Sequence, residues 1–376
     1  MIYKVKELVL KDKILENVFI EVNNGKFGKI LKDYDGDYED YSKYTMAPGY
    51  VDTHIHGYGG HDVMDLDGEG FLKICEGIVE NGVTSFLATT LTSSTENLDK
   101  ACEIVGEHYE KSKGAKVKGI FLEGPFFTEK HKGAQNPKYF CDPDIEKLKK
   151  WKELSKGLVN KIAIAPERDG SVEFIKEAKK LGVHVALGHS DATYEEAYDA
   201  VMAGADIFVH IYNGMSGLHH RKPGMVGAAL TTEDTTAEVI ADGHHVHPAA
   251  IKVVLNAKNY DHTALITDCM MAGGLSEGDY VLGEFDVKVA EGTARLKSDG
   301  SLAGSILKLD GGVRNVYNWK LASKFEAIQM ASQIPAKSVG IDDSCGIIEE
   351  GRDADFNILD DELNIIATFI DGEKMN

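Results

Sequence analysis

Residues 49–56 read GYVDTHIH, an apolar run that ends in two histidines at alternate positions. Similar runs recur along the chain, and the stretches between them carry apolar residues at helical spacing. The runs are residues 49–54, 83–88, 117–123, 162–166, 183–189, 207–210, 238–242 and 264–268. Strands that alternate with helices in this number predict an α/β protein with a (β/α)8 TIM-like barrel. A doubly wound open sheet is the competing fold.

The two ends of the chain follow a different pattern. Residues 1–48 alternate apolar and polar side chains between turn signals such as Asn24-Gly25, and residues 355–359 and 365–370 have the composition of short strands. We therefore expect residues 1–48 and 337–376 to pair into one small β-sandwich domain. Residues 49–336 would then form the barrel.

The composition excludes several classes of partner. The chain has 376 residues and a formal net charge of −20, from 41 Lys and Arg against 61 Asp and Glu. Nucleic acids and anionic membranes are bound through a basic face, and this chain has no basic block, so we expect neither partner. No apolar stretch approaches the roughly 20 residues that span a bilayer, and the N-terminus does not resemble a signal peptide. The expected location is the cytoplasm.

Side chains that can bind metals stand at the ends of several apolar runs. His54 and His56 lie on one face of an extended chain, because side chains at i and i+2 point the same way. Glu123, His189, His210 and Asp268 each stand at the end of a further run. The carboxyl ends of parallel barrel strands share one face, where such folds place their active sites. We expect these side chains to converge there.

Histidines and carboxylates without a thiolate are ligands that suit Zn²⁺, Fe²⁺, Mn²⁺ or Co²⁺. A cation of this kind lowers the pKa of bound water towards ~7, so that hydroxide is available at neutral pH. Asp268 has no evident capping or turn role and is placed to act as the general base. The pattern predicts metal-assisted hydrolysis.

Several segments resemble the amidohydrolase superfamily, and within it the N-acetylglucosamine-6-phosphate deacetylases. The resemblance extends over nearly the whole chain. Its segments are APGYVDTHIHG (47–57), FLEGPF (121–126), KGAQNP (132–137), LGHSDAT (187–193), VHIYNGMSGLHHRKPG (209–224), IADGHHVHP (240–248), ITDCMMAGG (266–274) and SLAGS (301–305).

The resemblance implies roles for individual residues. Glu123, His189 and His210 would hold the principal metal ion, and Asp268 would be the catalytic acid and base. His54 and His56 would add a second ion bridged by Glu123, so that one or two ions are bound per subunit. The implied substrate contacts are Ala134, Gln135, Asn213, Gly214, Arg221, His245 and Leu302. Arg221 suits a phosphate, because its guanidinium can donate two charge-assisted hydrogen bonds at once.

The reaction implied by the resemblance is deacetylation of N-acetyl-D-glucosamine 6-phosphate to D-glucosamine 6-phosphate and acetate, a step of amino-sugar catabolism. Metal-bound hydroxide would attack the acetamido carbonyl, and Asp268 would protonate the departing amine. The resemblance also implies a homodimer. Three alternatives stay open: the N-acetylgalactosamine epimer as substrate, another small amide, and a silent protein that binds metal or senses a sugar phosphate.

Overall fold

The computed structural model describes residues 1–376 and is built around an eight-stranded parallel sheet in which each strand lies beside the next one in sequence. The strands are β5 (Tyr50–Ile55), β8 (Val83–Thr90), β9 (Lys116–Phe126), β10 (Val159–Ile164), β11 (His184–Leu187), β12 (Ile207–Phe208), β13 (Thr236–Val239) and β14 (Thr263–Leu265). A parallel bridge between Ile55 and Cys269 joins the first strand to the segment after the last. This nearly closed ring confirms the predicted TIM-like barrel and excludes the open sheet.

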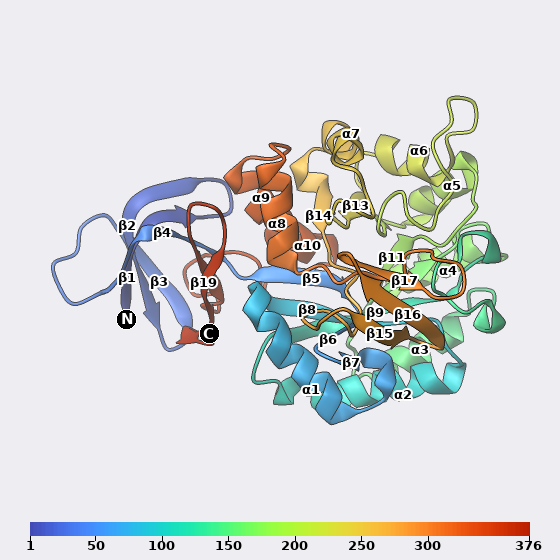
Figure 1. Ribbon diagram of the computed structural model, residues 1–376, viewed down its shortest axis with the longest axis horizontal. Coiled ribbons are helices and arrows are strands. Elements are labelled where there is room, and N and C mark those ends of the chain that lie inside the picture. The colour runs from blue at the N-terminus through green and yellow to red at the C-terminus, as the bar shows by residue number, and fades with distance from the viewer.

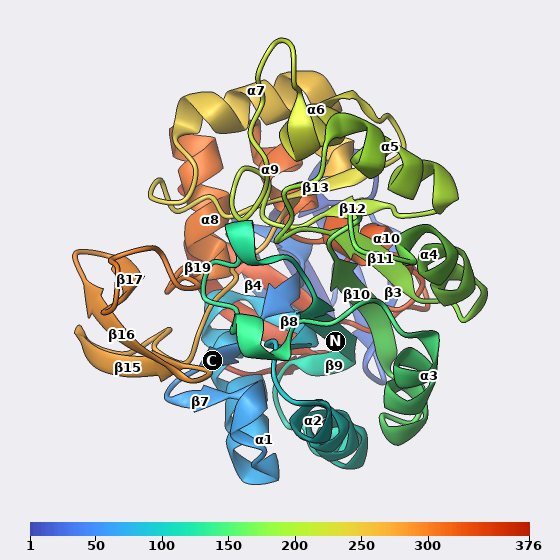
Figure 2. The same cartoon turned by 90° about the vertical axis from the view of Figure 1, so that its right-hand side faces the viewer.

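Helices surround the ring of strands (Figure 2). They are α1 (Gly68–Gly77), α2 (Thr95–His108), α3 (Ile145–Leu154), α4 (Ser171–Lys180), α5 (Tyr194–Ala203), α6 (Gly224–Thr231), α7 (Pro248–Lys258), α8 (Leu309–Asn318), α9 (Lys324–Met330) and α10 (Gln333–Ser338). Helix α5 begins at a capping box, in which the Thr193 hydroxyl accepts from the backbone of Glu196 and the Glu196 carboxylate accepts from Thr193. No helix is both long and apolar enough to cross a bilayer.

The barrel interior is packed with side chains that point inward from neighbouring strands. The inner cluster includes Val51, Leu87, Phe121, Ala163, Ala186 and Ile207, all buried. Ala336 of α10 and Val339 belong to the same cluster and cover one end of it. The interior is thus filled with side chains, and an active site can form only at the open end, where the strands finish.

Both chain ends contribute to a second sheet, with the order β20-β19-β18-β4-β1-β2-β3. Its strands are β1 (Ile2–Val9), β2 (Ile14–Asn23), β3 (Lys26–Leu31), β4 (Glu39–Pro48), β18 (Phe356–Leu359), β19 (Ile365–Ile370) and β20 (Glu373–Lys374). The sheet has a core of its own, in which Phe356 stacks on Phe369 with ring centroids 4.4 Å apart. Figure 1 shows it beside the barrel, with both termini in it. The predicted β element from both ends is confirmed, whereas the domain limits 1–48, 49–336 and 337–376 stay a prediction.

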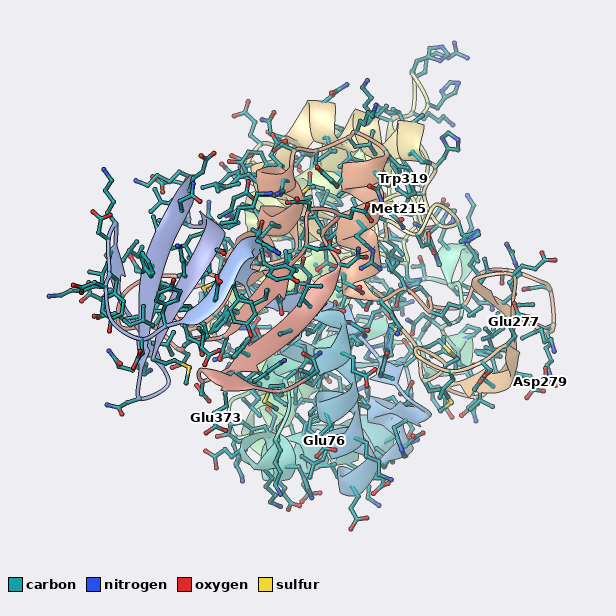
Figure 3. The ribbon with its side chains drawn as sticks, turned by 60° about the vertical axis from the view of Figure 1, so that its left-hand side comes forward. Glu76, Met215, Glu277, Asp279, Trp319 and Glu373 are labelled. Atoms are coloured by element: carbon teal, nitrogen blue, oxygen red, sulfur yellow. The ribbon has the colours of Figure 1, made fainter.

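A third, antiparallel sheet lies between β14 and α8 in the sequence and was not predicted. It consists of β15 (Gly278–Leu282), β16 (Phe285–Ala290) and β17 (Thr293–Leu296). Figure 3 shows Glu277 and Asp279 of this segment at the far side of the molecule from Glu373 of the small sheet. Leu282 and Leu296 pack with Met270, which follows Asp268 closely in the sequence. The sheet therefore borders the open end of the barrel.

Candidate active site

The seam that closes the barrel brings two predicted site segments together. The backbone N–H of Asp268 donates to the carbonyl of His54 at 2.8 Å, and the N–H of His56 donates to the carbonyl of Cys269 at 2.9 Å. As a result, Nε2 of His56 lies 3.1 Å from Oδ1 of Asp268. The first and last strands of the barrel thus supply neighbouring polar groups.

Four imidazole rings converge on the carboxylate of Glu123, which lies on β9 and is 2% exposed. Their Nε2 atoms lie 3.2 to 3.3 Å from its two oxygens; the rings are those of His54, His56, His189 and His210. All six metal-capable residues expected from the sequence therefore lie in one cluster at the carboxyl ends of the strands. Whether each of them binds metal stays a prediction.

Three of these residues have a left-handed backbone shortly after the end of a barrel strand. The φ angles are 46° at His189, 30° at His210 and 50° at Asp268. Residues other than glycine rarely adopt this conformation, and it tends to occur at functional sites, where the surrounding structure enforces it. Here it occurs two or three residues beyond the end of each strand, at the residue whose side chain joins the cluster. The apolar pattern of the strands carries no signal for this turn.

Hydrogen bonds at Nδ1 orient two of the rings. Nδ1 of His189 lies 3.1 Å from the carbonyl of His131, and Nδ1 of His210 lies 3.1 Å from the carbonyl of Asn213. A carbonyl oxygen only accepts, so each Nδ1 carries the proton and donates it. With Nδ1 held in this way, each ring directs Nε2 towards Glu123, and this is the atom that can bind a metal ion.

The cluster has strong internal electrostatic coupling. Burial disfavours a charged His54, but the carboxylates of Glu123 and Asp268 raise the pKa of this ring to about 9. Burial likewise opposes ionisation of Glu123, and yet the surrounding imidazoles hold its pKa well below the usual range. The carboxylates thus attract positive charge into a buried site. A divalent cation can replace the ring protons there, because metal binding releases protons from its ligands.

These residues fit a divalent cation. His54, His56 and Asp268 place ligand atoms within 4.8 Å of one another, and so do His54, Glu123 and His210. The buried Nε2 of His54 has no hydrogen-bond partner, which is a costly arrangement unless another group binds it. The chain therefore carries a potential metal-binding group of the predicted kind.

A pocket of about 400 Å³ opens above the cluster. It is lined by His56, Glu123, His189, His210 and Asp268, and by six predicted substrate contacts, Ala134, Gln135, Asn213, Gly214, His245 and Leu302. His54 lies beneath it, fully buried. Arg221 does not line this pocket. It is exposed and borders a separate cavity of about 920 Å³ together with Lys130 and Lys222.

Two predicted substrate contacts have partners within the protein. The amide nitrogen of Gln135 donates to Glu123 at 2.6 Å, and its amide oxygen accepts from the backbone of Thr92 at 3.0 Å. Nδ1 of His245 lies 2.6 Å from the carboxylate of Asp242, which fixes the orientation of the ring. Gln135 thus supports Glu123 directly, and its contact with a substrate stays a prediction.

Some polar groups around the site were not predicted. Arg295 of β17 lines the 400 Å³ pocket, but no sequence signal marked the third sheet. Lys161 and Glu238 form a fully buried ion pair inside the barrel. In the sequence, each of them is a charged residue within an otherwise apolar strand, and the sequence analysis did not single it out.

A barrel whose strand ends gather histidines and carboxylates around one buried glutamate has the site of a metal-dependent hydrolase. The pattern of the Amidohydrolase family matches residues 45–375, and the chain belongs to this family.

Relatives with assigned activities are similar over most of the chain. An N-acetylglucosamine-6-phosphate deacetylase of Vibrio furnissii is 41% identical over 328 residues, which cover 87% of this chain and 82% of that protein. An N-acetylgalactosamine-6-phosphate deacetylase of Escherichia coli O157:H7 is 40% identical over 329 residues, with 87% of both chains covered. A mutant N-acetyl-D-glucosamine-6-phosphate deacetylase from Mycobacterium smegmatis, solved with N-acetyl-D-glucosamine-6-phosphate, has a TM-score of 0.94 at 27% identity and covers 100% of this chain and 99% of that one.

Proposed function

We propose that this chain hydrolyses the acetamido bond of N-acetyl-D-glucosamine 6-phosphate, giving D-glucosamine 6-phosphate and acetate in amino-sugar catabolism. The observation that carries the proposal is the convergence of four imidazole Nε2 atoms on Glu123, with Asp268 beside them, at the floor of a pocket of about 400 Å³. Deacetylases of this sugar phosphate recur among the relatives.

The cofactor in this proposal is a divalent cation, Zn²⁺, Fe²⁺, Mn²⁺ or Co²⁺, held by Glu123, His189 and His210, with His54 and His56 as the ligands of a second ion. When bound, such a cation supplies Lewis acidity, which lowers the pKa of water and polarises a carbonyl oxygen. Metal content of the purified protein, measured by plasma mass spectrometry, identifies the metal and the number of ions per subunit.

Asp268 is the proton carrier in this mechanism. Its carboxylate takes a proton from the attacking water as the new C–O bond forms, and gives that proton to the amine nitrogen as the C–N bond breaks. Its pKa is lowered, against the effect of burial, by His54 and His56, so it is ionised and ready to accept at neutral pH. His245, oriented by Asp242, contacts the acetamido carbonyl or the sugar from the pocket wall.

Arg221 is the proposed phosphate contact. Because it is exposed and borders a different cavity, it reaches a sugar in the 400 Å³ pocket only after a movement of its loop or from a second copy of the chain. In the homodimer that the resemblance implies, Arg221 of one subunit would reach the pocket of the other. Sedimentation velocity, with and without the sugar phosphate, tests the dimer, and fractionation of the source cells tests the cytoplasmic location.

Free-amine release by the purified protein tests the proposed substrate. We expect turnover of N-acetylglucosamine 6-phosphate, a lower kcat/KM for the galactosamine epimer, and little turnover of unphosphorylated N-acetylglucosamine. A preference for the epimer would reassign the chain to the activity of its Escherichia coli relative. Binding of the sugar phosphate without any turnover would instead support a sensor. If the protein neither binds nor hydrolyses the sugar phosphate, another small amide would become the proposed substrate.

A further inference from the structure

Two charged side chains are fully buried inside the barrel beneath the histidine cluster. Lys161 comes from β10 and Glu238 from β13, and neither has any exposed surface. The ammonium of Lys161 donates to Oε1 of Glu238 at 2.5 Å. Nothing in the proposed reaction uses either group directly, so their presence in the interior needs an explanation.

Glu238 connects this ion pair to the cluster. Its second oxygen, Oε2, lies 3.3 Å from Nδ1 of His54. Its first oxygen also accepts from the hydroxyl of Thr53 at 3.2 Å. A carboxylate accepts, so Nδ1 of His54 donates to Glu238 and the opposite atom, Nε2, faces Glu123 at 3.2 Å. Glu238 therefore sets the orientation of the His54 ring from below the site, and it holds the proton on Nδ1 when a metal ion takes the place of the proton on Nε2.

The four rings of the cluster differ in this respect. His189 and His210 donate to backbone carbonyls, whereas Nδ1 of His56 has no partner in the protein. His54 is the ring whose Nδ1 meets a charged side chain. Carboxylate–histidine pairs of this kind orient metal ligands and raise their basicity, and loss of the carboxylate typically weakens metal binding by about 10- to 100-fold.

Lys161 stabilises the charged carboxylate of Glu238 in the apolar interior. An unpaired buried carboxylate is strongly disfavoured, and the ammonium balances its charge. The same ammonium lies 3.9 Å from the centroid of the Phe121 ring, which packs nearly at right angles to His54 with centroids 4.8 Å apart. A buried ion pair is weak evidence for stability, because apolar side chains of similar volume often stabilise a fold as well or better. A role in positioning explains the pair better than a role in folding.

We propose that Glu238 and Lys161 are positioning residues for the His54 half of the metal site: Glu238 fixes His54 as an Nε2 ligand, and Lys161 supplies the charge that allows Glu238 to remain there. This inference rests on the proposed metal-dependent function only in that the site binds a divalent cation. It predicts that the pair controls cation affinity at His54 and His56 more than at Glu123, His189 and His210.

The test compares Glu238→Gln and the double variant Glu238→Gln/Lys161→Met with the wild-type chain. Each apo protein is titrated with Co²⁺, and binding is followed by the visible d–d absorption of the ion and by metal content after gel filtration. We expect the affinity for the weakest-bound Co²⁺ to fall at least about 10-fold in both variants, with a changed absorption spectrum. Affinity for the tightest-bound ion should change less. A wild-type chain that binds only one Co²⁺, with an affinity that neither variant changes, would overturn the proposal.

Lys258→Met is the matched control, because Lys258 is another buried lysine, 4% exposed, that donates to Thr232 and Thr235 far from the cluster. We expect its Co²⁺ titration to match that of the wild type. Circular dichroism melting accompanies every titration. Because the replacements conserve volume, both test variants should fold; variants that do not fold would assign the pair to stability and overturn the proposal.

Wild-type Co²⁺ affinity and spectrum in a folded double variant would also overturn it. The readout is metal binding and not turnover, so the result is independent of whether N-acetylglucosamine 6-phosphate is the substrate. Failure of the substrate assignment and failure of the positioning role are therefore distinguishable.

Discussion

Oδ1 of Asp268 lies 3.1 Å from Nε2 of His56, across the seam where the first strand of the barrel meets the segment after the last. The backbone hydrogen bond from Asp268 to His54 that closes the barrel also sets this distance. The proposed proton carrier is therefore fixed to the proposed ligands by the architecture of the fold, and not by a mobile loop.

Replacement of Asp268 by Asn should abolish proton transfer while leaving the site assembled. The amide has nearly the same shape but does not accept a proton from water, so we expect kcat to fall by about 10³-fold or more. Metal content and affinity for the substrate should stay close to those of the wild type. Steady-state kinetics with plasma mass spectrometry check both. A kcat within tenfold of the wild-type value would remove Asp268 from its role.

Removal of the metal should destabilise the folded chain. The cation binds the assembled cluster and not the unfolded chain, so saturation at about 100 times its Kd adds roughly 2.7 kcal/mol to the free energy of unfolding. We expect the Tm to fall by several degrees after chelation and to recover when Zn²⁺ or Co²⁺ is restored. Differential scanning calorimetry makes the measurement. An unchanged Tm would argue against a metal at this site.

Arg221→Ala should reduce the selectivity for the phosphorylated sugar. Loss of a charge-assisted hydrogen bond of about 1.5–3 kcal/mol lowers kcat/KM for the 6-phosphate by roughly 10- to 100-fold and leaves the unphosphorylated sugar unaffected. Lys222→Ala is the control, since Lys222 is the adjacent exposed cation on the same cavity. Equal loss in both variants would point to a general electrostatic effect, and unchanged selectivity in Arg221→Ala would contradict its assignment.

The sequence was sufficient to predict the barrel and the cluster for one physical reason. Each strand of a parallel barrel is buried on both faces, so its sequence is a run of apolar residues. A polar residue at the end of such a run is therefore easy to recognise. Glu123, His189 and His210 were found in this way. The backbone bridge from Ile55 to Cys269, which joins the ends of the ring, is known only from the structure.

Other features left weaker signals. The strands β15–β17 form a surface sheet whose short alternating segments resemble ordinary loops and turns, so Arg295 was not placed at the pocket. Lys161 and Glu238 lie within strands, where one charged residue looks like the solvent side of an alternating pattern. Only the three-dimensional pairing shows that both point into the barrel. The separation of Arg221 from the pocket also depends on loop geometry that residue spacing does not encode.

Lys258 makes stability depend on pH in the alkaline range. Burial lowers its pKa to about 8 in the folded chain, although Asp234 and Glu233 oppose the shift, and the value is 10.5 in the unfolded state. Between pH 8 and pH 10.5 the unfolded chain therefore binds more protons, so this group adds to stability as the pH rises. The free energy of unfolding of the wild type, measured by urea denaturation, should rise relative to that of Lys258→Met between pH 8 and pH 10. A constant difference would contradict the assignment.

The most direct test of the proposed function is a single preparation assayed for acetate release from N-acetylglucosamine 6-phosphate as purified, after chelation, and after the metal is restored. We expect turnover that chelation abolishes and that Zn²⁺, Fe²⁺, Mn²⁺ or Co²⁺ restores. Turnover that survives complete removal of metal, verified by mass spectrometry, would contradict the role assigned to the cluster around Glu123.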